Sequence, residues 1–298
     1  MKRGVVIGIA AGAVALVLAG GAAWWLLARP ATAEQAAEAY LRALSDGDAT
    51  AVRGLLAEDP AGIDEVSAAF EGADGYLEDY RFEVRDDDSV RAEGMLGGEP
   101  AVVGFTLTDT DAGWKVDADY LATLDITTTV GDSVRVGGAL VPVGAVSLLP
   151  AVYTVTAAPT GLVEGSTTVA VTNAEPATAA VEASLSPDAI AAVQEQLDGY
   201  IAECTATATV VPAHCGIRVP WAADLATLAS VSFRVDTQPA LALAPDAQTF
   251  AATGGVIVAT ATGTTRDGSA ATFTYRADDW ALRGTVAFAG DTMTLSVG

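Results

Sequence analysis

Cys204, Cys215 and His214 are the residues of this sequence whose chemistry is easiest to name. They are the two cysteines and the one histidine in a chain of 298 residues. An even number of cysteines in an exported segment is typical of a disulfide, and we expect Cys204 and Cys215 to form one. A Cys–His nucleophile is the alternative. Adjacent residues of an extended strand point to opposite faces, so His214 would then point away from Cys215.

The residue types that metal binding and catalysis require are scarce. One histidine and two cysteines are too few for a typical zinc site, and the two lysines, Lys2 and Lys115, form no Ser-x-x-Lys motif. The sequence also contains no Gly-x-Ser-x-Gly motif and no phosphate-binding Gly-Lys-Ser/Thr loop. It therefore predicts no catalytic residue, no metal site and no cofactor.

Two acidic segments and three tryptophans have weaker functional interpretations. Residues 109–113 resemble the start of a calcium-binding loop. A loop that starts at residue 109 would need an oxygen ligand at its fifth position and a glutamate at its twelfth, but these positions are Gly113 and Tyr120. We therefore expect a tight turn. Residues 86–88 are three aspartates, which we interpret as a solvated turn rather than a metal site. The three tryptophans are Trp114, Trp221 and Trp280. They could form a sugar-binding platform, but they lie within strand and helix patterns, which favours positions in the core.

The charge of the chain excludes nucleic acid as a partner. There are 38 acidic residues against 15 Lys and Arg, which gives a formal net charge of -23. A surface this acidic repels a phosphate backbone. The composition is 51% hydrophobic, which is enough to build buried cores.

The amino-terminal segment predicts that most of the chain is exported from the cytoplasm. Lys2 and Arg3 precede an uncharged run at residues 5–28, which as a helix would extend roughly 36 Å at about 1.5 Å per residue. We expect residues 1–30 to be a transmembrane anchor, with Lys2 and Arg3 on the inside and Trp24 and Trp25 at the far interface. A cleaved signal peptide is the alternative, because residues 31–33 read Ala-Thr-Ala. Both alternatives export the rest of the chain.

Three further units follow from hydrophobic periodicity, and they predict an α+β fold. Apolar residues at helical spacing predict three helices between residues 33 and 70, and alternation from residue 82 to 118 predicts a four-stranded meander. We assign residues 31–124 to this first α+β unit and residues 125–183, which are rich in short strand patterns, to a small β-sandwich spacer. Ser186-Pro187 begins a helix that precedes further strands, so residues 184–298 form a second α+β unit containing the disulfide.

The two α+β units share a spacing of glycine and aromatic residues. Gly94 is followed by Phe105 and Trp114, and Gly263 is followed at similar intervals by Phe273 and Trp280. This similarity indicates either an internal duplication or a coincidence of strand periodicity.

Residues 38–56 begin with Glu-Ala-Tyr-Leu, contain Gly-Asp at positions 47 and 48 and end with Leu-Leu; a meander ending in Trp-Lys-Val follows. This combination resembles the exported cystatin-like domains of the nuclear-transport-factor-like superfamily. The resemblance implies a cone with a cavity between helices and sheet. That fold hosts binding modules, immunity proteins and a few isomerases and dehydratases. The isomerases use a buried aspartate as a base, and no residue of this chain can be matched to it.

The carboxyl-terminal part carries a second resemblance. Residues 197–204, the Pro-x-x-Cys at residues 212–215, Phe-Thr-Tyr at residues 273–275 and Trp280 look like membrane-anchored envelope proteins of actinobacteria, whose activity is unassigned. The order of anchor and units is also similar to the teicoplanin-resistance-associated membrane protein family, although its cytoplasmic zinc ribbon has no counterpart in this sequence.

These observations lead to one expected function and two alternatives. We expect a single-pass, membrane-anchored extracytoplasmic protein that binds or scaffolds cell-envelope components without catalysis, with the cell membrane as one partner and the cell wall or a membrane protein as another. The first alternative is an envelope-stress or antibiotic sensor acting through a membrane partner. The second is an isomerase-like enzyme in the cone cavity, for which a buried Asp or Glu with a perturbed pKa would be the evidence.

Overall fold

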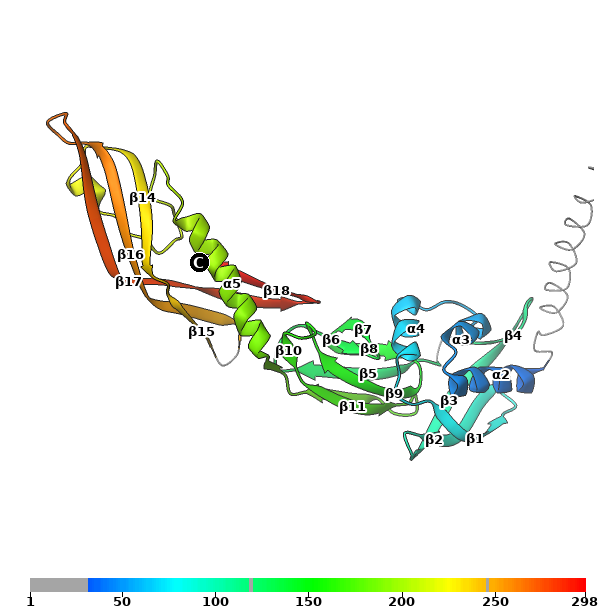
Figure 1. The fold of residues 1–298 in the computed structure, drawn as a ribbon. Coiled ribbons are helices and arrows are strands. Elements are labelled where there is room, and N and C mark those ends of the chain that lie inside the picture. The colour runs from blue at the N-terminus through cyan, green and yellow to red at the C-terminus, as the bar shows by residue number, and fades with distance from the viewer. Residues whose placement is uncertain (1–31, 118–119, 245–246) are drawn as a thin grey trace, which may run out of the picture.

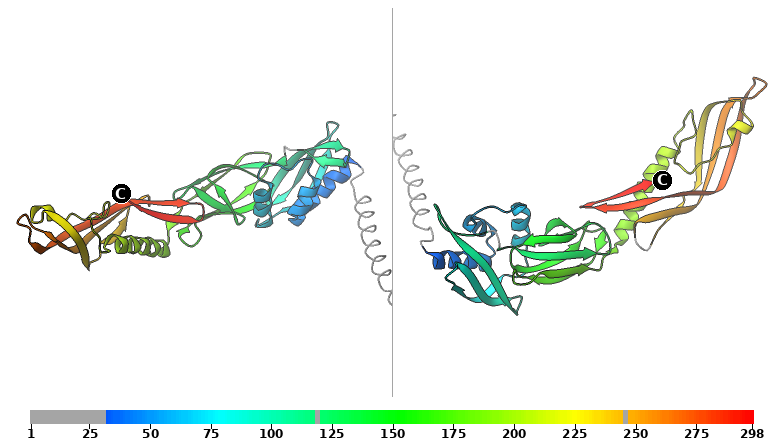
Figure 2. Two further views of the ribbon diagram at one scale, coloured as in Figure 1. Left: turned by 90° about the horizontal axis from the view of Figure 1, so that it is seen from above. Right: turned by 180° about the vertical axis from the view of Figure 1, so that it is seen from behind.

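The computed structural model describes residues 32–298 apart from 118–119 and 245–246, and it arranges them as three units in a row (Figures 1 and 2). The expected anchor, with Lys2, Arg3, Trp24 and Trp25, lies outside the described residues. Within the described residues, no helix is both long enough and apolar enough to cross a membrane.

The predicted α+β class is wrong, because the protein is mostly β. Strands account for 51% of the structure and helices for 20%, and the described residues contain four α-helices. The strand content exceeds the prediction largely after residue 226. There the sequence pattern suggests several short strands, but the structure has two long ones, Thr249–Thr264 and Ala270–Ala289. The pair Gly254-Gly255 suggests a turn, yet the strand continues through it with a shift in register.

In the first unit, helices cover an antiparallel sheet. Local capping explains where two of the helices begin: the Thr32 side chain accepts a hydrogen bond from the Gln35 N–H, and Asp48 accepts one from the Ala51 N–H. The sheet is a meander in the order β1-β2-β3-β4. The elements are α2 (Ala33–Asp46), α3 (Ala49–Leu55), α4 (Ile63–Glu71), β1 (Leu77–Val84), β2 (Ser89–Leu96), β3 (Glu99–Thr110) and β4 (Gly113–Val116).

The middle unit consists of two small sheets and a two-stranded ladder. One sheet has the order β11-β9-β6-β7, the other has the order β12-β5-β8, and β10 pairs with β13. Their inward residues are almost all aliphatic, with Tyr153 the largest. The strands are β5 (Ala122–Thr128), β6 (Ser133–Val136), β7 (Ala139–Pro142), β8 (Gly144–Leu148), β9 (Ala151–Ala157), β10 (Val163–Glu164), β11 (Ser166–Val171), β12 (Ala177–Val181) and β13 (Ser184–Leu185).

The third unit is one long helix within the bend of a five-stranded sheet (Figures 1 and 2). Ser186 caps the helix by accepting a hydrogen bond from the Ala189 N–H, and Pro187 occupies the first turn. Gln196 of the helix bonds the backbone of Met293 and Leu295. The elements are α5 (Pro187–Cys204), the short 3₁₀ helix η2 (Trp221–Ala223), β14 (Thr227–Thr237), β15 (Ala240–Leu243), β16 (Thr249–Thr264), β17 (Ala270–Ala289) and β18 (Thr292–Val297).

The first and third units place their corresponding aromatic residues differently. Phe105 lies on β3 and Trp114 on the next strand, β4, whereas Phe273 and Trp280 both lie on β17. The similar sequence spacing of these aromatic residues therefore does not place them at corresponding positions in the two sheets. The structure gives no support to an internal duplication.

Direct contacts join the three units. Between the first and the middle unit, the Asp74 N–H donates to the Val152 carbonyl at 2.8 Å and the Val152 N–H donates to the Gly75 carbonyl at 2.8 Å. Between the middle and the third unit, Arg135 forms an ion pair with Asp291 in the turn from β17 to β18. The buried side chains of all three units form one connected hydrophobic cluster. The units are thus joined by packing and hydrogen bonds as well as by the chain.

Candidate functional site

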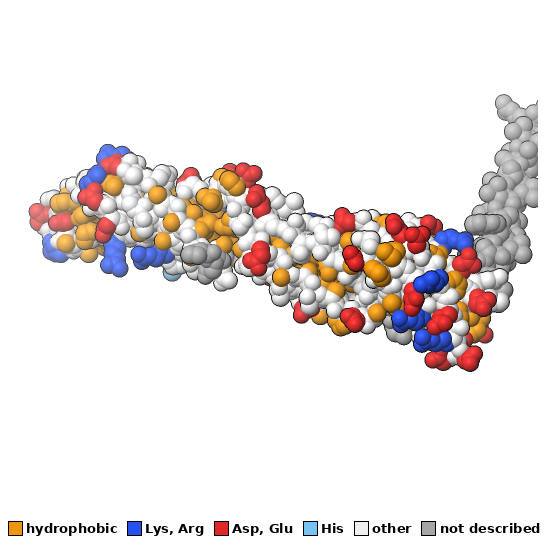
Figure 3. Space-filling view, turned by 90° about the horizontal axis from the view of Figure 1, so that it is seen from below, with side chains coloured by type: hydrophobic (Ala, Val, Ile, Leu, Met, Phe, Trp, Pro, Cys, Tyr) orange, Lys and Arg blue, Asp and Glu red, His pale blue; other side chains and the backbone are white. Residues whose placement is uncertain are grey.

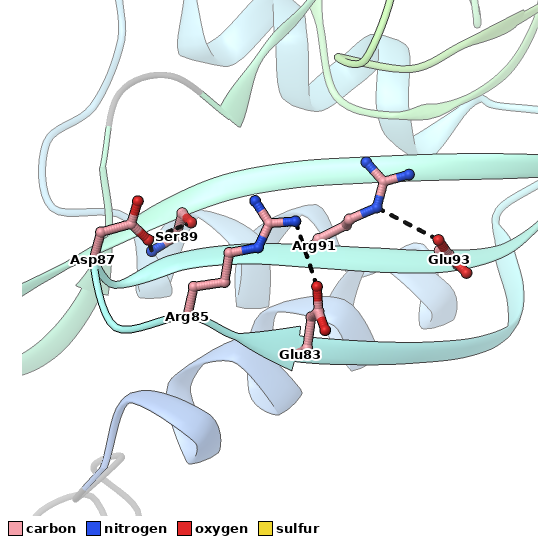
Figure 4. A network of polar contacts seen from close by, with 6 residues as sticks. All are labelled: Glu83, Arg85, Asp87, Ser89, Arg91 and Glu93. Carbon is pink, nitrogen blue, oxygen red and sulfur yellow. Dashed lines mark hydrogen bonds and ion pairs between the residues drawn. The ribbon is translucent and has the colours of Figure 1, made fainter.

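The hairpin of β1 and β2 carries a regular arrangement of opposite charges, which Figure 4 shows. Register pairing places Arg81 opposite Glu93 and Glu83 opposite Arg91, and Arg85 follows at the end of β1. Because side chains alternate along a strand, all five lie on the same face of the sheet. We call Arg81, Glu83, Arg85, Arg91 and Glu93 the arginine face.

The ion pairs of the arginine face are long. The Arg85 Nη2 lies 3.4 Å from the Glu83 Oε1, the Arg91 Nε lies 3.4 Å from the Glu93 Oε1, and the Arg81 Nε lies 3.8 Å from the Glu93 Oε2. Strong charge-assisted hydrogen bonds are about 2.7–2.9 Å long. Each guanidinium has five N–H donors, so most of these donors remain available to another anion.

The turn that joins β1 to β2 is held by its own side chains. The Asp87 Oδ1 accepts hydrogen bonds from the Ser89 hydroxyl at 2.6 Å and from the Ser89 N–H at 3.2 Å. These bonds stabilise the carboxylate and lower the pKa of Asp87. The turn fixes the register that brings Glu83 opposite Arg91. Within the described residues, no group of His, Cys, Asp or Glu is arranged to hold a metal ion.

A groove of about 310 Å³ lies where the arginine face meets the middle unit. Arg85, Ser89, Arg91 and Thr106 line it from the first unit, and Asn173 lines it from the loop between β11 and β12. Two guanidinium groups on one groove form a set that suits an anion with several oxygen atoms. In Figure 3 the basic side chains at the first-unit end of the molecule lie interspersed with acidic ones.

Asn173 connects the groove to the fold. Its Oδ1 accepts a hydrogen bond from the Gly104 N–H at 2.9 Å, and its Nδ2 donates to the carbonyls of Gly104 and Tyr120. One side chain of the middle unit therefore bonds β3 of the first unit and the segment that links the two units. No local pattern in the sequence singles out Asn173, because the contact joins residues that are 69 positions apart.

The predicted disulfide is confirmed. Cys204 and Cys215 are bonded, with their Cα atoms 5.7 Å apart. Cys204 ends α5, so the bond ties the end of the helix to the loop that follows it. His214 is exposed, and its carbonyl accepts a hydrogen bond from the Tyr200 hydroxyl. The disulfide lies in the third unit and the arginine face in the first, so the structure does not bring these two features together.

The three tryptophans do not share one surface. Trp114 lies on β4 in the first unit, whereas the other two lie in the third unit. Trp280 is buried, and its Nε1 donates to the Cys215 carbonyl at 2.9 Å. Trp221 begins η2 and is half-buried. The structure therefore does not assemble a sugar-binding platform from all three.

Aromatic side chains occupy the interior between the helices and the sheet of the first unit. Tyr40 packs edge-on against Phe105, with ring centroids 4.7 Å apart, and against Tyr120 at 6.2 Å. Burial, and secondarily the charge of Asp59, raises the pKa of Tyr120 to about 12. Among the described residues no Asp or Glu is buried, so the isomerase-like alternative gains no support from a buried carboxyl base.

The comparisons with known proteins identify no relative. No family model, no curated protein and no solved structure matches the chain.

Proposed function

We propose that this protein is an extracytoplasmic scaffold that is anchored through its amino terminus and binds a component of the cell envelope without catalysis. The main support for the scaffold proposal is that direct contacts join neighbouring units at both boundaries. Asp74 and Val152 pair across the first boundary, and Arg135 and Asp291 pair across the second. A chain built in this way holds its far end at a fixed distance from its point of attachment.

The disulfide agrees with this proposal. Disulfides persist in oxidising compartments and are rare where the glutathione pool keeps thiols reduced. The Cys204–Cys215 bond therefore favours a location outside the cytoplasm.

The arginine face supports the binding part of the proposal. Residues 31–124 contain 22 acidic and 6 basic side chains, and three of these 6 are Arg81, Arg85 and Arg91. The hairpin of residues 77–96 has seven acidic residues against these three arginines, so the part of it that suits an anion is the groove lined by Arg85 and Arg91. Anionic groups of the cell wall are the ligand class that this site suits.

Co-sedimentation of the detergent-solubilised full chain with purified cell-wall sacculi tests the proposal. We expect saturable pelleting that the triple substitution R81Q/R85Q/R91Q reduces at least tenfold. The matched control is R42Q/R234Q/R283Q, which removes three exposed arginines elsewhere and leaves the net charge equal to that of the test variant. A chain that stays in the supernatant contradicts wall binding. Equal loss in both triple variants contradicts a role for the arginine face.

A further inference from the structure

A cleft of about 330 Å³ lies in the third unit, between the segment after the disulfide and the sheet. Ile217, Arg218 and Pro220 line one side of it, and β16 and β17 line the other. At its base, Ile257 and Ala259 are almost fully buried and expose little surface to the cleft, whereas Tyr275 and Ala277 of β17 are half-buried. The cleft is remote from the arginine face, since the middle unit lies between them (Figure 1).

The segment on one side of the cleft is a strap fixed at both ends. At its start, the disulfide holds Cys215, whose carbonyl accepts the Trp280 Nε1 hydrogen bond. At its end, the Tyr275 hydroxyl donates to Asp224 at 2.8 Å, and Arg266 donates to two carbonyls of η2 at 3.0 Å each. Between these attachments, the backbone of residues 216–219 makes no hydrogen bond to any described residue.

The opposite side of the cleft is an unpaired strand edge. β17 pairs with β16 along one side, and β18 covers its other side only at residues 284–289. At residues 274–277 no described strand lies on that other side. Every second N–H and C=O group of an antiparallel edge points outward, so β17 has unpaired donors and acceptors along the residues that line the cleft, as the strap does.

Arg218 gives the cleft a positive charge. Of the arginines in the described residues, only Arg218 and Arg283 have a guanidinium group with no hydrogen bond and no ion pair. The other arginine at the cleft, Arg276, is bonded to Asp236 and Asp278. An unpaired guanidinium suits a carboxylate as its partner.

We infer that this cleft binds a short, extended peptide of small residues through its C-terminal carboxylate. The peptide backbone would pair with the edge of β17 and with residues 216–219, as in recognition by strand addition. Its side chains would contact the half-buried Tyr275 and Ala277, and its carboxylate would bond Arg218. A cleft of this volume has room for only a few peptide residues. In a short peptide without acidic side chains, the C-terminal carboxylate is the group that can pair with Arg218. This site goes beyond the scaffold function and does not depend on it.

Calorimetric titration of the detergent-solubilised full chain with N-acetyl-trialanine tests the inference. We expect saturable binding to the peptide with a free C-terminal carboxylate and at least tenfold weaker binding to the peptide amide. R218Q should weaken binding of the carboxylate form at least tenfold, because it removes the charge and the guanidinium donors but keeps a polar side chain. R283Q is the matched control, since it removes the other unpaired arginine, and it should bind like the unchanged chain.

Three outcomes would overturn the inference: no saturable binding of the carboxylate form, equal affinity for the amide, or equal affinity in R218Q. Arg218 is exposed, so R218Q removes no buried contact, and its circular dichroism spectrum checks that it is folded. Pelleting with sacculi distinguishes this site from the arginine face, because R218Q should pellet normally even if peptide binding is lost.

Discussion

The backbones of Gly72 and Gly137 are in direct contact across the boundary between the first and the middle unit. A Cβ atom built on Gly72 would lie 1.8 Å from the Gly137 carbonyl oxygen, and one built on Gly137 would lie 2.0 Å from the Ala69 carbonyl oxygen. Gly137 also has a φ of +55°, in the left-handed region. Glycine at both positions allows the end of α4 to approach the turn between β6 and β7.

Replacing Gly72 by Ala should therefore destabilise the protein. Because backbone atoms would have to move apart, we expect G72A to lower the free energy of unfolding by about 1–3 kcal/mol, as overpacking does. Gly54 in α3 is the control, since a Cβ there meets nothing within 4 Å. G54A should be neutral or stabilising by up to about 1 kcal/mol. Urea unfolding of both variants measures the difference, and equal stabilities would contradict close packing at this boundary.

Removing the Asn173 amide should weaken the same boundary. N173A loses the bonds to Gly104 and Tyr120, and we expect a loss of about 1–3 kcal/mol in the free energy of unfolding. Gln194 is half-buried, and its amide bonds Asp198, one turn along α5. Q194A should change stability by less than about 0.5 kcal/mol. Chemical denaturation compares the two, and a small effect of N173A would show that packing alone holds the units together.

Two buried tyrosines should respond oppositely to loss of the hydroxyl group. The Tyr120 hydroxyl is buried without a hydrogen-bond partner in the described residues, whereas the Tyr153 hydroxyl donates to the Leu149 carbonyl at 2.7 Å. We expect Y120F to stabilise the protein by about 1 kcal/mol and Y153F to destabilise it by about 1–2 kcal/mol. Thermal unfolding followed by circular dichroism gives both values. A destabilised Y120F would show that this hydroxyl has a bonding partner after all.

Reduction of the disulfide should destabilise the third unit. The two cysteines are 11 residues apart, and in the loop-entropy model a loop of about this size stabilises by roughly 3 kcal/mol. We expect dithiothreitol to lower the urea midpoint of the unchanged chain. The double variant C204S/C215S should already have the lower midpoint and should not respond to the reductant. An unchanged midpoint after verified reduction would contradict this prediction.

Acid should remove a contribution made by Asp236. Hydrogen bonds from Arg234, and then from Arg276, lower the pKa of this carboxyl in the folded protein. A lowered folded pKa adds stability above the unfolded pKa of about 3.9, and that stability is lost as the pH falls through the folded pKa. We therefore expect D236N to be less stable than the unchanged chain at pH 7 and to converge with it as the pH falls through the lowered folded pKa.

The control for this titration is E99Q, because Glu99 forms no ion pair with the described residues. Urea midpoints measured at a series of pH values should run parallel for E99Q and the unchanged chain. If D236N also runs parallel, the arginine contacts of Asp236 contribute nothing measurable in solution.

Local signals in the sequence predicted the features that depend on neighbouring residues. The capping residues Thr32 and Asp48 mark helices that the structure contains, and the cysteine count gave the disulfide. The arginine face also has a local signal in the sequence. Charges alternate at residues 81–85 and 91–93 on either side of a predicted turn, so pairing across that turn brings Glu83 opposite Arg91.

Features that depend on distant residues could not be predicted in the same way. The Asn173 contacts join separate units, and a single asparagine in a loop carries no periodicity. The α+β class was wrong partly because Asp278-Asp279 and Gly254-Gly255 have the composition of turns. Neighbouring strands keep both pairs within extended chain, since β16 and β17 pair on each side of them. Tertiary pairing overrode the local preference.

The length of β17 has a mechanical consequence. The strand has 20 residues and would measure about 66 Å at about 3.3 Å per residue. It begins near the tip of the molecule farthest from α2 (Figure 1) and ends at the turn where Gly290 and Asp291 bond the middle unit. Tension applied at that tip would pass along one continuous strand to the turn that bonds the middle unit. A partner that pulls on the tip would therefore load the ion pair between Arg135 and Asp291.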